Sequence, residues 1–415
     1  MQNFRKHIRT GVAAVAVALM SAGTASVFAP IASAQQQTDN KPFLDAYTAA
    51  KGLVDARKYA EAVPKMEQAA TTAKSNQEKV AAALMRVQVY GALKKWPELI
   101  KAIEAHKALG GLNAAQQRNY KEVLAGAYGQ TRQTDKAVQL TKELIGETGG
   151  TATQLAYVAG YALARKQYSE AESYGLKAIQ KSSRPDIKHY NIVLAAYLNA
   201  GKLDQYYALL EKAAPMFNSP DYWRPFVERA KKEPKFRPDD GLLDVYRALR
   251  ATNVKLNTQE QKELGDFALN QGLPVEAEAE LAPLFKAGTL GGKDDPQADR
   301  NKRYFERAKS DAAAMKSNLA KLEAEAATKP TGAEYVRIGQ TYMTLGDAKK
   351  AIEFLNKGLA KGGMEPAETD YAKLRLGIAQ FNAGQKADAR KTWSELKSDN
   401  GAGWLAKVWT AKART

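Results

Sequence analysis

The sequence contains no cysteine, only three histidines and only 15 prolines in 415 residues. Without cysteine the chain has no disulfide, no thiolate nucleophile and no cysteine-ligated zinc. Three histidines are too few for a histidine-cluster metal site. The composition is nevertheless 45% hydrophobic, which is typical of a globular chain rather than a disordered one. These absences argue against most metal and thiol chemistry, and we expect no metal ion and no cofactor.

Residues 1–34 have the pattern of an export signal. Three basic residues and no acid occupy the first ten positions, an apolar stretch follows at 11–20, and Ala32-Ser33-Ala34 has the small-x-small form that signal peptidase cleaves. An uncleaved membrane anchor is the alternative, since residues 11–38 carry no charge and such a stretch can span a bilayer. Pro30 and the weak hydrophobicity of the alanine-rich stretch favour cleavage after Ala34. We therefore expect a periplasmic protein with no membrane span after cleavage; secretion is the alternative.

The remaining sequence repeats one pattern: a small residue in a first helix, a turn containing Gly, Lys or Arg, then alanine in a second helix. The small-residue position falls at 50, 87, 125, 159, 194, 265, 339 and 377. Most intervals are 34–38 residues, and the two long ones, of 71 and 74 residues, predict degenerate helix pairs at 220–250 and 298–327. Small residues let the two helices approach closely, and each hairpin leaves an apolar face that only its neighbour can cover.

This pattern resembles the tetratricopeptide repeat (TPR), a pair of antiparallel helices of about 34 residues. The usual Trp at position 4 and the closing Pro are mostly missing, so the resemblance rests on the period, which covers nearly all of the mature chain. It implies an all-α fold, a right-handed superhelix or α-solenoid of about ten helix-turn-helix units. The segment from Tyr222-Trp223 through 270–277 is also similar to TPR proteins found beside TonB-type energy-transducing systems.

The repeat positions predict the domain organisation of the chain. A signal peptide at 1–34 precedes an N-terminal array at 35–285, then a hinge at 286–300 indicated by its Gly and Pro content, C-terminal units at 301–400, and a capping helix at 401–415. The expected units lie near 43–72, 80–109, 118–146, 152–181, 187–215, 220–250, 258–286, 298–327, 332–362 and 370–398.

Apparent catalytic motifs fail on their context. Ser394-Glu-Leu-Lys397 and Ser398-Asp-Asn400 are contiguous, whereas in penicillin-binding enzymes the corresponding motifs lie far apart and converge in space. Glu276, Glu278 and Glu280 are interpreted as a solvated helix face. His106 falls at a packing position and His189 at a helix start, and neither has a second histidine near it. We expect the protein not to be an enzyme.

The resemblance to TPR arrays implies that the first helices line a concave groove, with positions 2, 5, 9 and 12 pointing inward. Over the eight clear units these 32 positions hold five charges, with a net charge of +1. A polyanion-binding groove needs many Lys and Arg residues, so nucleic acid is disfavoured and an extended peptide or helix fits better. The partner-groove residues that we single out are Tyr47, Lys51, Leu84, Gln88, Leu163, Leu198, Leu269, Met343, Tyr371 and Phe381.

These observations predict a non-catalytic periplasmic scaffold or adaptor that binds a polypeptide in its groove, within an envelope or TonB-type transport complex. Replacing the expected anchors Tyr47 or Phe381 by Ala should then weaken binding without unfolding the array. The alternative is a periplasmic accessory protein that binds or processes anionic cell-wall polymers, because the mature chain keeps a net charge of 59 − 45 = +14. That alternative predicts Lys and Arg gathered on one surface.

Overall fold

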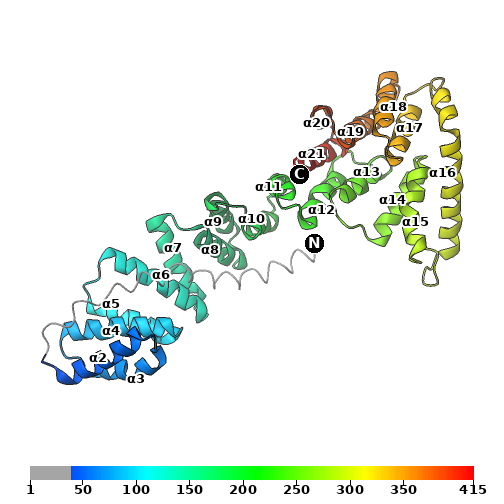
Figure 1. Cartoon of the computed structure of the whole chain (residues 1–415). Helices are drawn as coiled ribbons and strands as arrows, with labels where there is room; N and C mark the ends of the chain where they lie inside the picture. The colour runs from blue at the N-terminus through cyan, green and yellow to red at the C-terminus, as the bar shows by residue number, and fades with distance from the viewer. Residues whose placement is uncertain (1–38) are drawn as a thin grey trace. The chain divides into compact units, whose positions relative to one another are not determined.

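The computed structural model describes residues 39–415 (Figure 1). The expected signal peptide therefore lies outside the described residues. From residue 39 onward the chain forms α-helices and one 3₁₀ helix, and this part contains no β-strand, which confirms the all-α fold class. The chain divides into two units, a first that ends at Leu203 and a second, Asp204–Thr415.

The first unit is a stack of helical hairpins in which each helix packs on the next one along the chain. Contacts between α2 and α4, and between α8 and α10, join the first helices of neighbouring hairpins. The helices are α2 (Lys41–Asp55), α3 (Tyr59–Thr72), α4 (Asn76–Ala92), α5 (Trp96–Leu109), α6 (Ala114–Gln130), α7 (Thr134–Thr148), α8 (Ala152–Ala164), α9 (Tyr168–Lys181) and α10 (Ile187–Asn199).

Small residues and helix caps explain these hairpins. Capping boxes at Ser75, Asn113 and Thr151 start α4, α6 and α8 by accepting from backbone N–H groups that the helix leaves unpaired. The repeated alanine of the second helix is fully buried, as at Ala62. At the small position of a later hairpin, a Cβ on Gly377 would lie 2.2 Å from the indole nitrogen of Trp393. The small residues thus set the close approach of the helices.

The second unit also consists of consecutive helices. They are α11 (Leu203–Phe217), α12 (Pro220–Glu228), η2 (Arg229–Lys232), α13 (Pro238–Ala251), α14 (Thr258–Asn270), α15 (Pro274–Lys286), α16 (Ala298–Ala326), α17 (Ala333–Thr344), α18 (Ala348–Lys361), α19 (Pro366–Asn382), α20 (Lys386–Ser394) and α21 (Ala402–Lys412).

The helix pair expected at 298–327 is wrong, because this stretch is the single 29-residue helix α16. Between Ala298 and Ala326 the sequence has neither Gly nor Pro and is rich in Ala, Lys, Glu and Arg. These residues favour an uninterrupted helix, and none of them supplies the turn that a hairpin needs.

The expected hinge at 286–300 remains a prediction, although apolar contacts anchor its start. Leu290 is buried against Leu281 and Leu284 of α15. Phe285 stacks on Phe305 of α16, with ring centroids 4.4 Å apart. The loop is therefore packed between the two helices that it joins.

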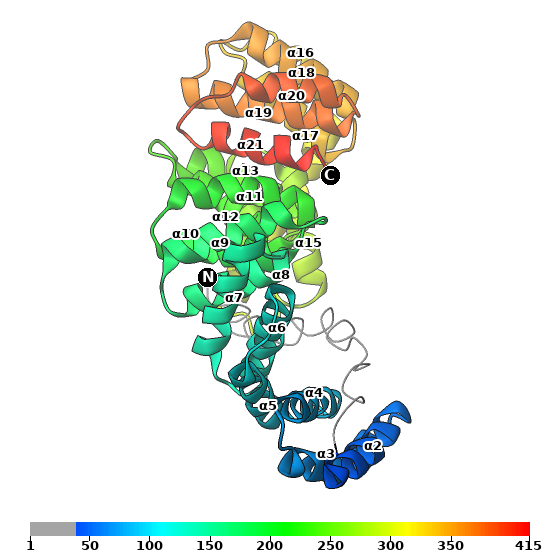
Figure 2. The same cartoon turned by 90° about the vertical axis from the view of Figure 1, so that its left-hand side faces the viewer.

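The second unit closes on itself. The expected capping helix, α21, packs on α19 and α20 as a cap should, but it also contacts α12, α13 and η2 at the start of the unit (Figure 2). The indole N–H of Trp404 donates to the backbone oxygen of Phe226 at 2.7 Å, and the Lys235 N–H donates to the Asp399 oxygen at 2.9 Å. The C-terminal helix therefore packs on both the end and the start of this unit.

Candidate functional site

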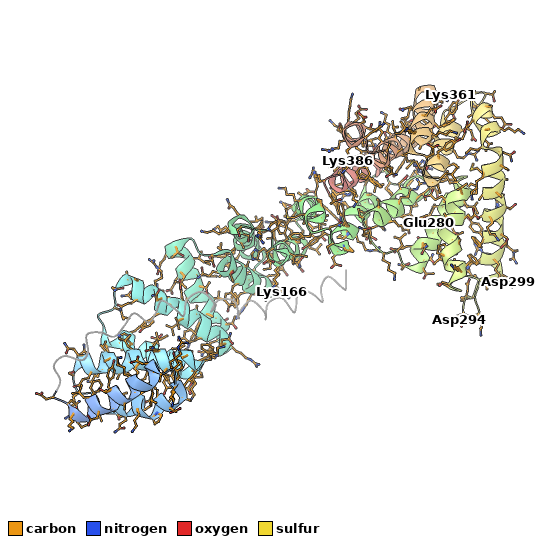
Figure 3. The ribbon with its side chains drawn as sticks, viewed as in Figure 1. Lys166, Glu280, Asp294, Asp299, Lys361 and Lys386 are labelled. Atoms are coloured by element: carbon orange, nitrogen blue, oxygen red, sulfur yellow. The ribbon has the colours of Figure 1, made fainter. Side chains whose placement is uncertain are left out.

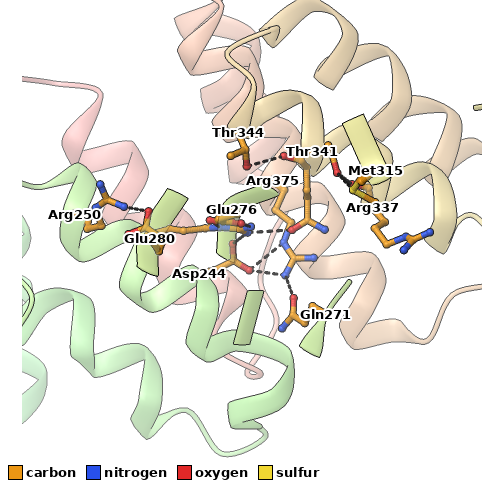
Figure 4. Close-up of polar contacts among 12 residues, drawn as sticks. Asp244, Arg250, Gln271, Glu276, Glu280, Met315, Arg337, Thr341, Thr344 and Arg375 are labelled. Atoms are coloured by element: carbon orange, nitrogen blue, oxygen red, sulfur yellow. Dashed lines mark hydrogen bonds and ion pairs between the residues drawn. The ribbon is translucent and has the colours of Figure 1, made fainter. Parts of the chain in front are cut away.

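Closure of the second unit places a charged cluster in its interior (Figure 4). Asp244 of α13 is fully buried and lies against two guanidinium groups. Arg375 of α19 donates to Asp244 Oδ2 from Nε at 3.0 Å and from Nη2 at 2.7 Å, and Arg247 Nη1 donates to Asp244 Oδ1 at 2.8 Å. Because both carboxylate oxygens are occupied, this buried charge is well compensated.

A second set of contacts joins the cluster to α15 and α17. Arg247 Nε donates to Glu276 Oε1 at 2.7 Å, and its Nη1 donates to the Gln340 side-chain oxygen at 3.0 Å. Arg247 therefore contacts three side chains at once, that of Asp244 on its own helix and those of Glu276 on α15 and Gln340 on α17. We call Asp244, Arg247, Glu276, Gln340 and Arg375 the buried charge network.

The prediction of a solvated glutamate face on α15 is wrong for two of its three members. Glu276 and Glu280 are buried, and they pair with Arg247 and Arg250 of α13. Glu278 stays half-buried and pairs with Lys316 of α16 at 2.9 Å. Sequence spacing shows that the glutamates recur along one helix, but it does not show that α13 brings arginines to them.

The electrostatics of the buried charge network favour its ionised form. Burial alone would raise the pKa of Asp244, but the charges and hydrogen bonds of Arg375 and Arg247 outweigh it and hold that pKa below its usual range. Burial would likewise lower the pKa of Arg247, and Glu276 and Asp244 reverse the effect. The network is therefore an internal ion cluster that joins helices far apart in sequence.

The groove residues expected in the second unit contribute mainly to its packing. Leu269 and Tyr371 are buried, and the Tyr371 hydroxyl donates to the Asn400 oxygen at 2.7 Å. Met343 packs partly buried against the core around α17 and α18. Phe381 is half-buried, with its ring centroid 6.1 Å from those of Trp393 and Trp409. Leu269 and Tyr371 are therefore core residues, whereas Met343 and Phe381 keep part of their side chains exposed.

In the first unit, the other expected groove residues remain accessible. Lys51, Leu84, Gln88, Leu163 and Leu198 are all half-buried, on α2, α4, α8 and α10. Lys51 Nζ lies 2.7 Å from Asp55 Oδ2 in an exposed ion pair. We call these five residues the first-helix face; its composition is mixed apolar and polar, as a polypeptide-binding surface requires.

Tyr47 is the exception within the first unit, because it is a core residue. Its side chain is 5% exposed and its ring stacks on Phe43 at 5.3 Å. The expectation that Tyr47→Ala leaves the fold intact is therefore wrong. Position 5 of this helix points into the core formed by α2, α3 and α4.

The Tyr47 hydroxyl is buried and has no hydrogen-bond partner in the described part of the chain. An unpaired buried hydroxyl carries a desolvation cost of about 1–3 kcal/mol. Tyr47→Phe should therefore keep or raise the free energy of unfolding of the first unit, by up to about 1 kcal/mol, whereas Tyr47→Ala should lower it by about 3–5 kcal/mol. Urea titrations followed by circular dichroism measure both changes. A clear loss of stability in Tyr47→Phe would show that the hydroxyl has a partner.

Both described histidines are packing residues, as their positions predict. His106 is buried, and its Nδ1 lies 2.6 Å from the Tyr120 hydroxyl. His189 is buried beside Ser182, whose Oγ lies 2.9 Å from its Nδ1. Burial lowers the pKa of each, so both are neutral near pH 7. Among residues 39–415, no group of three or more His, Asp or Glu side chains is placed to hold a metal ion.

Two further features complete the picture of the described chain. None of its helices is long and apolar enough to cross a bilayer. The sequence alone does not distinguish the basic residues at four hairpin turns of the first unit, Arg57, Lys94, Arg132 and Lys166, from scattered surface charge. Their sequence signal is the basic residue that takes the place of Gly in the repeated turn.

No protein-family profile matches the chain, and no curated protein matches it. One similar solved structure is a tetratricopeptide repeat protein from Parabacteroides merdae, with 12% sequence identity, a TM-score of 0.31, and coverage of 82% of this chain and 99% of that chain. A TM-score this low transfers no binding mode, so the fold assignment rests on the helix pairs of this chain itself.

Proposed function

We propose that the chain is an exported, non-catalytic scaffold that binds a polypeptide partner on the first-helix face of its first unit. The observation that carries this proposal is the contrast between the two units. Of the expected groove residues, five of the six in the first unit keep half-exposed side chains, against two of the four in the second unit, whose interior holds the buried charge network and Tyr371. Partner binding is therefore assigned to the first unit alone.

The chemistry of the first-helix face suits a peptide or a partner helix. Leu84, Leu163 and Leu198 offer apolar contact area, while Gln88 offers an amide that can donate to and accept from a backbone. An apolar contact area with a few polar groups is the usual anatomy of a protein interface. Residence in the envelope, beside a TonB-type or other transport complex, is the finer part of the proposal and rests on the expected export signal.

Site-specific photocrosslinking in intact cells tests this proposal. A photoreactive amino acid at Gln88 should give one discrete adduct, because this residue lies on the first-helix face. The matched control is Gln68, an exposed glutamine on the second helix α3 of the neighbouring hairpin. Adducts of equal yield at both positions, or none at Gln88, would contradict binding on this face.

The same cells test export. The mature chain should be released by osmotic shock and should begin at Gln35, directly after the expected cleavage site. A chain that stays in the cytoplasm would contradict the envelope part of the proposal but not the binding face.

A further inference from the structure

Four hairpin turns of the first unit contain a basic residue in the left-handed backbone region. Every other positive-φ residue from 39 to 415 is Gly or Asn, the types that tolerate this conformation. The four exceptions, with their φ angles, are Arg57 (58°), Lys94 (55°), Arg132 (60°) and Lys166 (62°).

Glycine is the residue that this turn position favours on steric grounds. The corresponding turns of the second unit use Gly272, Gly346 and Gly384. Glycine adopts this conformation without the steric cost that a side chain brings. The recurrence of a long cationic side chain in four consecutive hairpins therefore indicates that the side chain itself has a use.

These four cations are free to meet an external partner. All four are exposed, and none forms an ion pair within the described residues. Three of the acids that begin the second helices are already engaged: Glu61 by Lys58 at 3.7 Å, Asp135 by Arg165 at 2.6 Å and Glu170 by Lys142 at 2.5 Å. The fourth acid of this set is Glu98, at the start of α5.

The turns lie along one edge of the stack. Each connects the first helix of a hairpin to the second, and each hairpin packs on the next through α3 and α4, α5 and α6, and α7 and α8. The capped starts of α4, α6 and α8 lie at the opposite ends of the first helices. The four turns therefore follow one another along the stack, one in each successive hairpin. We call this row the turn edge; Figure 3 labels its last member, Lys166.

We infer that the turn edge docks the protein on an anionic lipid surface. The whole first unit supports this, since residues 39–203 contain 24 Lys and Arg against 15 Asp and Glu, a net charge of +9. Each basic residue near an anionic bilayer strengthens binding by about fivefold. The contact is purely electrostatic, because the aromatic residues beside two of the turns, Tyr59 and Trp96, pack into the hairpins rather than outward.

A lipid surface fits this row better than a soluble polyanion does. Polyanion-binding proteins surround the polymer with a cationic groove. The four cations instead lie in four successive turns and are exposed, so each can meet a surface outside the stack. Docking by this edge leaves the first-helix face free, so the inference goes beyond the proposed partner binding and does not depend on it.

Vesicle sedimentation with the mature chain tests the inference. The vesicles contain about 30% phosphatidylglycerol in phosphatidylcholine, or phosphatidylcholine alone, at about 0.15 M salt. The turn variant combines R57G, K94G, R132G and K166G, which restores the residue that the backbone favours. The matched control, K65Q, K79Q, K177Q and K188Q, removes four exposed cations that lie away from the turn edge.

We expect the turn variant to bind anionic vesicles roughly 600-fold more weakly than the parent chain, and the control to lose about fivefold or less. The turn variant should melt at or above the temperature of the parent, so its loss is not unfolding. Equal losses in both variants, or no preference for anionic vesicles, would overturn the inference. So would binding of soluble polyphosphate that the turn variant loses while vesicles remain unbound, because it would assign the edge to a polymer. The Gln88 crosslink is unaffected by any of these outcomes, which separates this test from that of partner binding.

Discussion

Arg375→Ala should lower the free energy of unfolding of the second unit by about 3–5 kcal/mol, the usual cost of removing one partner of a buried ion pair. The variant leaves Asp244 fully buried with only Arg247 to compensate it. Tryptophan fluorescence in a urea titration measures the change, because four of the five tryptophans, all except Trp96, lie in the second unit.

A matched control separates the lost ion pair from the loss of any arginine. Arg390 on α20 is exposed and forms no ion pair within the described residues, so Arg390→Ala should change stability by no more than about 0.5 kcal/mol. If Arg375→Ala and Arg390→Ala were equally stable, the buried charge network would not hold the unit together.

The same network predicts a pH dependence. The pKa of Asp244 is lowered in the folded state, so on acidification the unfolded state binds the proton first. The stabilisation that ionised Asp244 supplies is complete above the ordinary aspartate pKa of about 3.9. It is lost as the pH falls through the lower pKa that Asp244 has in the folded state. The second unit of the parent chain should therefore lose stability below about pH 4, and this part of the loss should be smaller in Arg375→Ala.

The fold could be predicted from the sequence because its determinants are local. The recurring small residue and the buried alanine, such as Gly377 and Ala389, mark where the two helices of a hairpin touch. The same spacing gave a wrong prediction at 298–327. A single helix of 29 residues occupies about as many residues as a helical hairpin, so the interval between repeats is the same in both cases. Only the absence of Gly and Pro between Ala298 and Ala326 distinguishes a single helix from a hairpin here, and the repeat spacing contains no information about it.

The interior of the second unit could not be predicted in the same way, since its contacts join residues far apart in sequence. Asp244 and Arg375 are 131 positions apart. A weaker signal exists, because each is a lone charge in an apolar run, between Leu243 and Val245 and between Leu374 and Leu376. Two opposite charges in such positions suggest a pair, but closure of the unit is what brings them together. The sequence likewise assigns Tyr371 to the partner groove, because the closure of the unit that buries this side chain cannot be seen in the sequence.

Deleting residues 401–415 should unfold the second unit while the first unit keeps its helices. The deletion removes three large buried side chains, Leu405, Val408 and Trp409, each of which contributes about 1.5–3 kcal/mol. The total is comparable to the whole stability of a typical domain, about 5–15 kcal/mol. Limited proteolysis should then leave a protected fragment that ends near Leu203, and circular dichroism should show loss of part of the helix signal. Deleting only Arg414 and Thr415, which are exposed, should have no such effect.

This deletion distinguishes a closed unit from an open array with a removable cap. In an open array each hairpin contacts only its neighbours, so loss of a cap frays the last hairpin and leaves the others folded. Here α21 also contacts the start of the unit: the Trp404 ring lies 5.5 Å from that of Tyr207 and 5.6 Å from that of Phe226, and the Arg229 guanidinium lies 5.0 Å from it. Its removal therefore exposes both ends of the unit at once, and unfolding should be cooperative. A truncated chain that loses only α19 and α20 would instead show that α21 acts as a simple cap.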